Sequence, residues 1–534
     1  MRTAVKLIPA ILAFTISVSG QCQETVFDLL KSEITLADNY FRNKDYYNAL
    51  LLYRHIVKKN PSRDIELKIA RSHHFLKQHD KAVTIYEKYA RHSSLPVNDL
   101  YYYAEAQTGT SNYAKAVETY QNYLSQVPDD DLIIKKIWRL NNLQYLYEDS
   151  MHYDVRRAQF NTGYGELCAI PFRNGVVFMS NRKEVQPIEN LDAVLHAQFY
   201  KVYFSRTHAD STREGFLRFE TPAIFNRELQ SKFHAGPFAF YDNSRKMVFV
   251  STSDKTTKNG GRVLQLYFAE NTSDGGWKTK YGFPFNGKNY SITDPWISEN
   301  GKVLYFSSDM KGGFGAKDIY KSELVNNHWT KPVNLGEVIN TAHDEVSPFH
   351  QNQTLYFASD GHPGLGGLDI FKAEEGSQGF MEPQNAGYPL NTNYDDFGMV
   401  FDSLSNHGFF SSNRKEGGYN DDVYEFEMDI QTYPLELRGV MKFKEHSLSD
   451  SVELKIMPNA KIYLIDYVRN LTVQERACDA DGNFSIVVPY YSKYKLKVVG
   501  EDNHENIVSL DIPKHKKEQS VHDIVVVKDA FKSN

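Results

Sequence analysis

The hydrophobic period of the chain changes once along its length, and the change predicts two kinds of structure. From residue 25 to about 150, apolar positions recur with helical spacing. From about 155 onward they recur in short alternating runs that are typical of strands. The pattern predicts a multidomain α + β protein whose first part is all helical.

The helical part repeats itself. Three stretches superimpose, because Ala49 and Ala82 are spaced by 33 residues and Ala82 and Ala116 by 34. Each of these alanines is followed four residues later by a tyrosine, and each stretch is preceded by another alanine where two helices must approach closely: Ala37, Ala70 and Ala104. The stretches resemble tetratricopeptide repeats, so we expect an α-solenoid over residues 25–150.

The middle part repeats a strand motif. Tyr-Phe-Ser-Ser-Asp at 305–309 recurs with small changes at 356–360 and 409–413, and weaker copies lie near Ser180 and Ser251. The copies resemble WD40-like (PD40) repeats of the TolB type, which implies a β-propeller over residues 155–430. Five copies predict five blades, and the 71 residues between Ser180 and Ser251 leave room for a sixth.

The last part alternates apolar and polar residues over short runs. Such runs occupy 435–440, 460–465, 483–488 and 494–499, which predicts a small β-sandwich over residues 434–530. The entry into the second run and the hairpin at 479–484 resemble the carboxypeptidase regulatory-like domain. That resemblance implies no peptidase chemistry.

The first twenty residues are typical of an export signal. Two basic residues precede an apolar run over 7–18, which is too short to cross a bilayer. We expect residues 1–20 to be removed. Cys22 follows closely enough to be a candidate for lipidation, although Gln21 is bulkier than the residue that a lipid-attachment motif normally has before the cysteine.

Composition and charge narrow the classes of function. The chain is 41% hydrophobic with 35 Tyr and 33 Phe, which favours packed domains over long disorder. The formal net charge of −6 offers no basic excess for nucleic acid or for an anionic membrane surface. Three widely separated cysteines imply no disulfide framework, and no segment is apolar over the length of a transmembrane helix.

Motifs that carry chemistry are missing from the sequence. It has no Gly-x-Ser-x-Gly elbow, no Cys-x-x-Cys pair and no His-Glu-x-x-His helix, so we expect no enzyme activity, no cofactor and no metal. Asp318, Asp369 and Asp422 recur at equivalent positions before apolar strands, which predicts a turn-capping or inter-blade role. Acidic loops at 343–345 and 393–396 could chelate calcium, but they lack the spacing of an EF-hand.

The concave face of the solenoid is the predicted partner-binding site, because first-helix positions line that face in such arrays. Projection of the repeat places six side chains there: Asp38, Arg42, Arg71, His74, Tyr101 and Glu105. The alternative is that these residues are only solvated charges.

The order of the three parts behind an export signal resembles the PorE-like family of Bacteroidetes envelope proteins, which belong to type IX secretion and gliding machinery. The resemblance implies a periplasmic protein at the outer membrane whose partners are envelope proteins such as outer-membrane barrels or secretion components. Family members usually continue into an OmpA-like peptidoglycan-binding domain, for which residue 534 leaves no room. We therefore expect no direct binding to peptidoglycan.

Two hypotheses about function follow. The first is a non-catalytic scaffold for protein–protein interaction that supports a secretion, gliding or surface-transport machine. The alternative is a glycan- or peptide-binding, or hydrolytic, protein that uses the pocket of the propeller. Convergent carboxylates with perturbed pKa values at one mouth of the propeller would favour the alternative.

Overall fold

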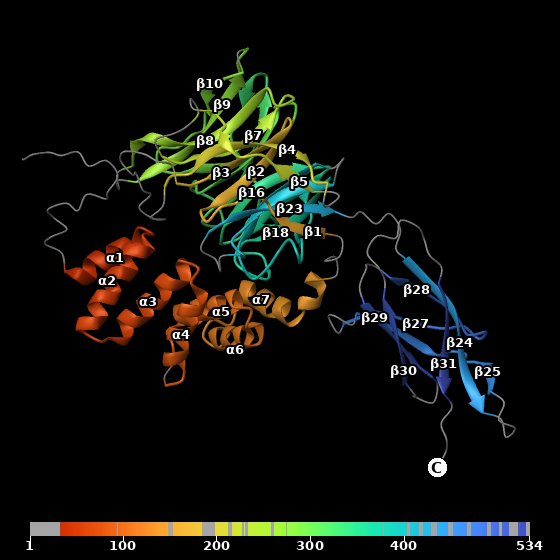
Figure 1. The fold of residues 1–534 in the computed structure, drawn as a ribbon. Coiled ribbons are helices and arrows are strands. Elements are labelled where there is room, and N and C mark those ends of the chain that lie inside the picture. Colours follow the sequence, from red (N-terminus) through yellow and green to blue (C-terminus); the bar gives the residue numbers. More distant parts are fainter. Residues whose placement is uncertain are drawn as a thin grey trace, which may run out of the picture.

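The computed structural model shows three successive regions: helices, a ring of sheets and a final pair of sheets (Figure 1). The predicted export signal and Cys22 lie outside the described residues. The structure describes residues 32–529 with gaps at 93, 148–152, 184–197, 212–215, 227–228, 230–232, 258–260, 274, 378, 403–405, 416–419, 429–434, 447–451, 467–470, 489–492, 501–504 and 512–521.

The first region is built from helices that pack in sequence order. Each helix contacts the next one along the chain, as in an α-solenoid. Its members are α1 (Glu33–Arg42), α2 (Tyr46–Lys59), α3 (Arg63–Phe75), α4 (His79–Ala90), α5 (Val97–Gly109), α6 (Tyr113–Leu124) and α7 (Asp131–Asn141).

Small side chains allow these helices to approach closely. The six alanines of the sequence repeat all have zero exposed surface. Tyr53, Tyr86 and Tyr120 are also buried and fill the space between neighbouring helices. Caps fix some of the helix starts, since the Asp45 carboxylate accepts from the backbone N–H of Asn48 at 3.1 Å.

The second region consists of five antiparallel sheets among the described residues 153–428. The first sheet contains β2 (Glu166–Phe172), β3 (Gly175–Ser180), β4 (Lys201–Ala209), β5 (Leu217–Phe219) and β6 (Ala223–Ile224), and the second contains β7 (Ala235–Tyr241), β8 (Lys246–Thr256), β9 (Arg262–Asn271) and β10 (Trp277–Gly282). The third sheet contains β11 (Ile292–Ile297), β12 (Val303–Ser308), β13 (Asp318–Val325), β14 (His328–Trp329) and β15 (Val333–Asn334), and the fourth contains β16 (Glu345–Gln351), β17 (Thr354–Ser359), β18 (Asp369–Gly376), β19 (Gly379–Phe380) and β20 (Gln384–Asn385). The fifth sheet contains β21 (Asp396–Asp402), β22 (His407–Ser412), β23 (Asp422–Met428) and β1 (Tyr153–Arg157).

These sheets form a closed ring. We call the strand given first for each sheet its first strand: β2, β7, β11, β16 and β21. Each first strand contacts the next one in this order, and β21 contacts β2. The ends of the region meet because β1, which comes first, pairs with β23, which comes last. Arg157 also donates two hydrogen bonds to the Asp422 carboxylate, and the Glu166 N–H donates to the Asp421 carbonyl at 2.8 Å. The pairing with β1 covers the edge of β23 that would otherwise be open.

The third region contains two four-stranded sheets that share one core. Buried side chains from both sheets, among them Leu437, Ile462, Phe484 and Leu496, form a single hydrophobic cluster. One sheet holds β24 (Leu435–His446), β25 (Val452–Ile456), β28 (Asn483–Val488) and β31 (His522–Asp529), and the other β26 (Lys461–Asp466), β27 (Leu471–Ala477), β29 (Lys493–Val499) and β30 (Glu505–Asp511).

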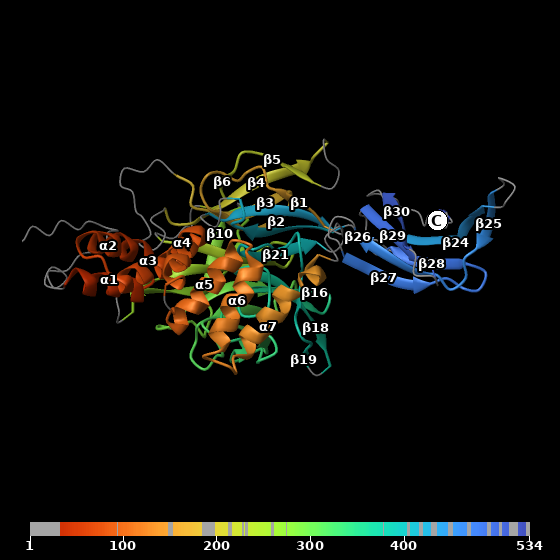
Figure 2. The same ribbon diagram turned by 90° about the horizontal axis from the view of Figure 1, so that it is seen from below.

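The solenoid lies against one end of the ring. Figures 1 and 2 show α5 to α7 across the loops that lead into the strands, while the third region stands to one side. Asn393 Nδ2 donates to the Gly109 carbonyl at 2.7 Å, and the Tyr388 N–H donates to the Leu146 carbonyl at 2.6 Å. These bonds join segments that are more than 200 residues apart in the sequence.

Candidate functional site

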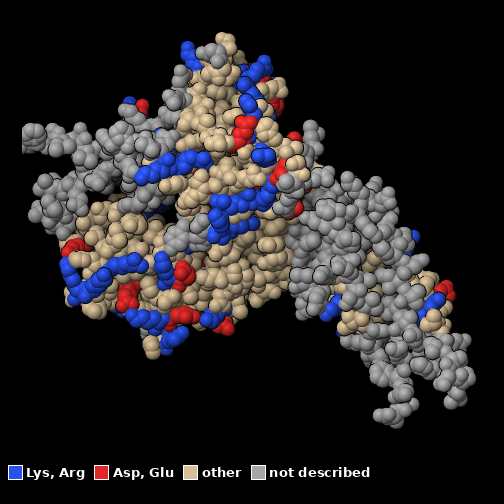
Figure 3. All heavy atoms as spheres, viewed as in Figure 1, with Lys and Arg blue, Asp and Glu red and all other residues tan. Residues whose placement is uncertain are grey.

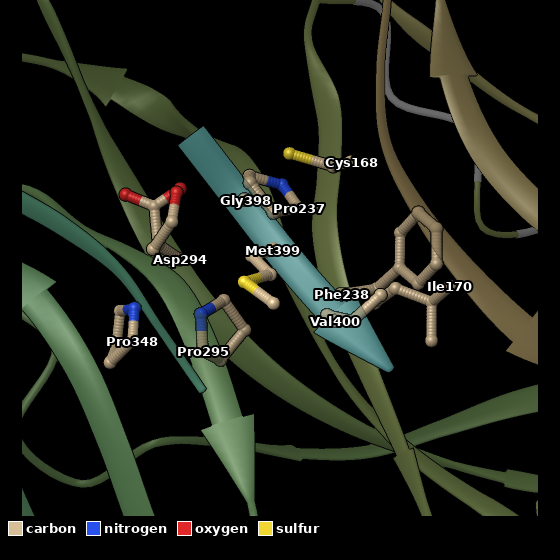
Figure 4. Close-up of a pocket in the computed structure, with 11 residues that line it drawn as sticks. Cys168, Ile170, Pro237, Phe238, Asp294, Pro295, Pro348, Gly398, Met399 and Val400 are labelled. Atoms are coloured by element: carbon tan, nitrogen blue, oxygen red, sulfur yellow. The ribbon is translucent and has the colours of Figure 1, made fainter. Parts of the chain in front are cut away.

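A cavity lies at the centre of the ring, and all five first strands line it. Figure 4 shows its side chains gathered around the strand that carries Gly398, Met399 and Val400. The other lining residues come from β2, β7, β11 and β16: Cys168, Ile170, Pro237, Phe238, Asp294, Pro295, Ser347 and Pro348.

One backbone feature repeats around this cavity. Each first strand has a register shift and, within it, one residue with positive φ: Cys168, Gly236, Asp294, Ser347 and Gly398. Such bulges bend a strand and redirect a side chain. The bulges therefore place one residue of each sheet at the same level of the central axis.

The cavity itself is small and mostly apolar. Its volume is about 40 Å³. Since one water needs roughly 10–15 Å³ of such space, the cavity has room for roughly three waters. Asp294 and Cys168 are its ionisable groups, and burial raises the pKa of both. A sugar ring is larger than this space, so a ligand of that size would bind at the mouth of the cavity.

The mouth that faces the solenoid is rich in carboxylates. Asp344 and Asp395 directly precede β16 and β21, whose bulges line the cavity, and Asp421 directly precedes β23. Burial and the charge of Asp360 raise the pKa of Asp344. Burial and the charge of Asp395 raise the pKa of Asp421 to about 7. We call Asp344, Asp395 and Asp421 the acidic mouth.

A lysine of the solenoid reaches this acidic mouth. Lys77 lies in the turn between α3 and α4, and its Nζ is 2.9 Å from Asp395 Oδ1. Burial alone would raise the pKa of Asp395, but the Lys77 charge and the hydrogen bonds from Lys77, Leu368 and Asn413 together outweigh it and lower that pKa. Lys77 also partly offsets the raised pKa of Asp421. The two regions thus share one electrostatic site.

Other carboxylates of the ring have a structural role. Asp318 accepts from the backbone N–H groups of Phe314 and Gly315 at 2.6 and 2.9 Å, and Asp369 accepts from that of Leu365. The turn-capping role predicted from the sequence is confirmed for these two residues. The third member of the predicted set, Asp422, instead accepts from Arg157, as described above.

The structure divides the six predicted partner-binding residues into two groups. In the first group, Asp38 accepts from Lys68 Nζ at 3.0 Å, and Arg71 donates to the buried carboxylate of Asp99 at 2.7 and 2.6 Å. Arg42 is exposed and donates to a side chain of its own helix. Intramolecular pairs therefore occupy much of the polar surface that was predicted to contact a partner.

The second group faces the ring. Glu105 accepts from Lys136 Nζ at 2.7 Å, and the Tyr101 ring lies 6.3 Å from the ring of His343, which precedes β16. Burial lowers the pKa of His74 to about 3. Glu105 also lines a small pocket with His362, Gly364 and Gly366 of the ring, so Glu105 and Tyr101 lie at the junction of the solenoid with the ring. The His74 ring lies beside this junction, with its centroid 5.2 Å from that of Tyr102.

Half-buried aromatic rings extend from this junction along the solenoid. The ring centroid of Phe75 lies 5.7 Å from that of Phe41, 4.6 Å from that of Tyr46 and 5.3 Å from that of Tyr102. The ring centroids of Tyr102 and Tyr101 are 5.5 Å apart. We call these five side chains the aromatic row. It ends at the residue that touches the ring, so it leads toward the acidic mouth.

Sequence reasoning missed the acidic mouth. It considered Asp344 and Asp395 only as parts of calcium-binding loops and did not single out Asp294 or Asp421. An alignment of the five first strands at their bulges would have placed Asp344 and Asp395 at one common position, three residues before Ser347 and Gly398. In the described part of the chain, no group of three or more His, Cys, Asp or Glu side chains could hold a metal ion.

Among the described residues, no helix is both long and apolar enough to cross a membrane. A family model for the tetratricopeptide repeat matches residues 100–130, which span most of α5, all of α6 and the turn after it. This match and the seven helices confirm the predicted repeat in the first region. No curated protein matches the chain.

Solved structures that share a distant likeness with the chain include enzymes. A GH43_1 enzyme from Xanthomonas citri is 10% identical, with 59% of this chain and 96% of that chain covered at a TM-score of 0.33. A glycosyl hydrolase from Bacteroides ovatus is 12% identical, with 49% and 84% covered at 0.30. A mannose phosphorylase from Leishmania mexicana is 12% identical, with 55% and 93% covered at 0.31.

These neighbours contradict the expectation that the protein is not an enzyme, because all three are enzymes. That expectation rested on missing sequence motifs, and a site assembled from separate strands of a ring leaves no local motif to find. The likeness is too distant to assign a reaction to this chain.

Proposed function

We propose that the protein binds a peptide segment of a partner at the junction of the solenoid and the ring. The observation that carries the proposal is the acidic mouth above the central cavity, whose Asp421 has a pKa raised to about 7 by burial and a neighbouring carboxylate. Carboxylates with perturbed pKa values in a concave place are typical of functional sites. The aromatic row supplies an adjoining wall.

Charge favours a peptide over a neutral glycan. Five carboxylates interact with three lysines at this mouth, so negative charge is in excess there when all are ionised: Asp294, Asp344, Asp360, Asp395 and Asp421 with Lys44, Lys77 and Lys317. A lysine or arginine side chain would compensate it, whereas hydroxyl groups would not. Aromatic side chains also attract cations through their ring faces. We therefore propose a ligand that carries at least one cationic side chain.

We further propose the finer assignments of fold and location. The five sheets are the blades of a five-bladed propeller, and the third region is a regulatory-like sandwich. The protein is exported to the periplasm, and its partners are outer-membrane or secretion components, as in the PorE-like family. What supports these proposals is the ring closure, the shared core of the last two sheets and the order of the three regions.

Oriented peptide libraries test the proposed function. Fluorescent nonapeptides with a fixed central Lys, Glu or norleucine and random flanks are titrated against the protein and followed by anisotropy. We expect binding of the Lys library only, a weakening of about tenfold in Asp421→Asn, and no change in the control Glu374→Gln, which alters an exposed acid on β18.

Two outcomes would overturn the proposal. Equal binding of the three libraries would remove the role of charge, and binding of neutral oligosaccharides without any peptide binding would replace the peptide by a glycan. Mass spectrometry of the incubated peptides shows whether they are cleaved, which would extend the function from binding to hydrolysis.

A further inference from the structure

The turn that carries Lys77 has a conformation shared by all three repeats. Lys44, Lys77 and Ser111 occupy the same position between paired helices and have φ values of 64°, 57° and 57°. A left-handed residue at this position ends one helix and starts the next. Since serine serves the turn equally well, the turn itself does not require a lysine at residue 77.

The ring holds the receiving carboxylate without help from the solenoid. Asp395 Oδ1 accepts from the Leu368 N–H at 3.0 Å, and Oδ2 accepts from Asn413 Nδ2 at 3.0 Å. Gly367 keeps the approach open, because a Cβ there would lie 2.0 Å from Asp395 Oδ1 and 3.3 Å from Lys77 Nζ. The Asp395 carboxylate is therefore held in place whether or not Lys77 contacts it.

Other bonds dock the solenoid on the ring. The bonds from Asn393 to Gly109 and from Tyr388 to Leu146 involve the end of α5 and the turn after α7. Neither bond involves the turn between α3 and α4. A long, flexible side chain such as Lys77 can leave Asp395 while these bonds persist.

We propose that Lys77 is an internal competitor for the acidic mouth, and this inference rests on the proposed function. Its ammonium group occupies the place that a cationic side chain of the ligand takes, so binding requires that Lys77 be displaced. The contact is autoinhibitory: it compensates the buried carboxylate in the free protein and makes weak cationic ligands fail to bind. A partner that also engages the aromatic row supplies the further contacts that displacement needs.

Substitution of Lys77 tests this inference. The Lys library is titrated against wild type, Lys77→Ala, Lys77→Arg and the control Lys58→Ala, which removes an exposed charge at the end of α2. We expect about tenfold tighter binding in Lys77→Ala, and wild-type affinity in Lys77→Arg and in the control. Binding by Lys77→Ala where wild type shows none also supports the inference.

A second readout follows the lysine itself. Reductive methylation read by mass spectrometry should label Lys77 faster when the peptide is bound, relative to Lys58. Equal affinity in wild type and Lys77→Ala, with unchanged labelling, overturns the competitor but leaves the proposed function standing. Lower affinity in Lys77→Ala makes Lys77 part of the binding site and also overturns it. Binding by neither protein removes the proposed function together with this inference.

Discussion

Glu345 is a buried carboxylate that accepts hydrogen bonds from the ring but has no cation beside it among the described residues. It has no exposed surface and accepts from Thr341 N, Thr341 Oγ1 and Ser359 Oγ, each at 2.7 Å. At the matching positions of other sheets, Arg182 contacts Glu166 and Arg414 contacts Asp396. In the fourth sheet, Gly361 occupies the position of these arginines.

Burial raises the pKa of Glu345 from 4.5 to about 7, with a smaller contribution from the charge of Asp360. The native state therefore holds this proton at a pH where the unfolded chain has lost it. Between pH 4.5 and 7 the free energy of unfolding falls as the pH rises, and the loss at this site is about 3 kcal/mol. Above pH 7 the loss is complete.

Glu345→Gln removes this titration. The amide also has a cost at every pH, because its donors face a Ser359 hydroxyl that already accepts from the N–H groups of Gly361 and His362. The informative quantity is therefore the change with pH. From pH 5 to 8, the melting temperature of the ring should fall by about 5 °C more in wild type than in the variant.

Differential scanning calorimetry across this pH range measures the effect. Glu166→Gln is the control, because its carboxylate is paired with Arg182 at 3.2 Å. We expect Glu166→Gln to melt at a lower temperature than wild type at every pH, while its melting temperature changes with pH as steeply as that of wild type. Parallel curves for wild type and Glu345→Gln would refute the reasoning that burial without a cation sets this pKa.

Three further substitutions test the packing and the ring closure. Ala70→Leu adds volume at a position with no exposed surface and should destabilise the helical region by about 1–3 kcal/mol in thermal circular dichroism; an unchanged midpoint would contradict close helix contact. Tyr120→Phe removes the hydroxyl that donates to Glu105 and should cost about 1–2 kcal/mol in urea unfolding, a loss that an intact midpoint would disprove. Arg157→Ala leaves the buried Asp422 without its bidentate partner and should cost about 3–5 kcal/mol, with partial recovery in Arg157→Lys; proteolysis of the ring no faster than in wild type would contradict this role in closure.

The repeats could be predicted from the sequence because they follow from local spacing. Alanines at intervals of 33 and 34 residues mark the places where helices touch, and the structure buries all of them. The recurring Ser-Asp segments likewise fall at the ends of β12 and β17. Both signals depend on neighbours within about fifty residues, and a sequence pattern carries that information directly.

The candidate site could not be predicted in the same way. Lys77 and Asp395 are 318 residues apart, and nothing local to either residue indicates that they meet. The concave residues were identified from the repeat alone, so the pairs that Asp38 and Arg71 form, and the contact of Tyr101 with the ring, were not foreseen. Missing motifs also suggested no enzyme, which the neighbouring structures contradict.

By itself, the sequence determined the periods, and with them the helical first region and the strand-rich remainder. The tertiary structure decided which strands close the ring, since β1 could in principle extend other sheets and only its pairing with β23 joins the two ends. It also decided that the solenoid covers one mouth of the ring. Burial then follows from this arrangement, and burial sets the charge states of Asp421 and Glu345.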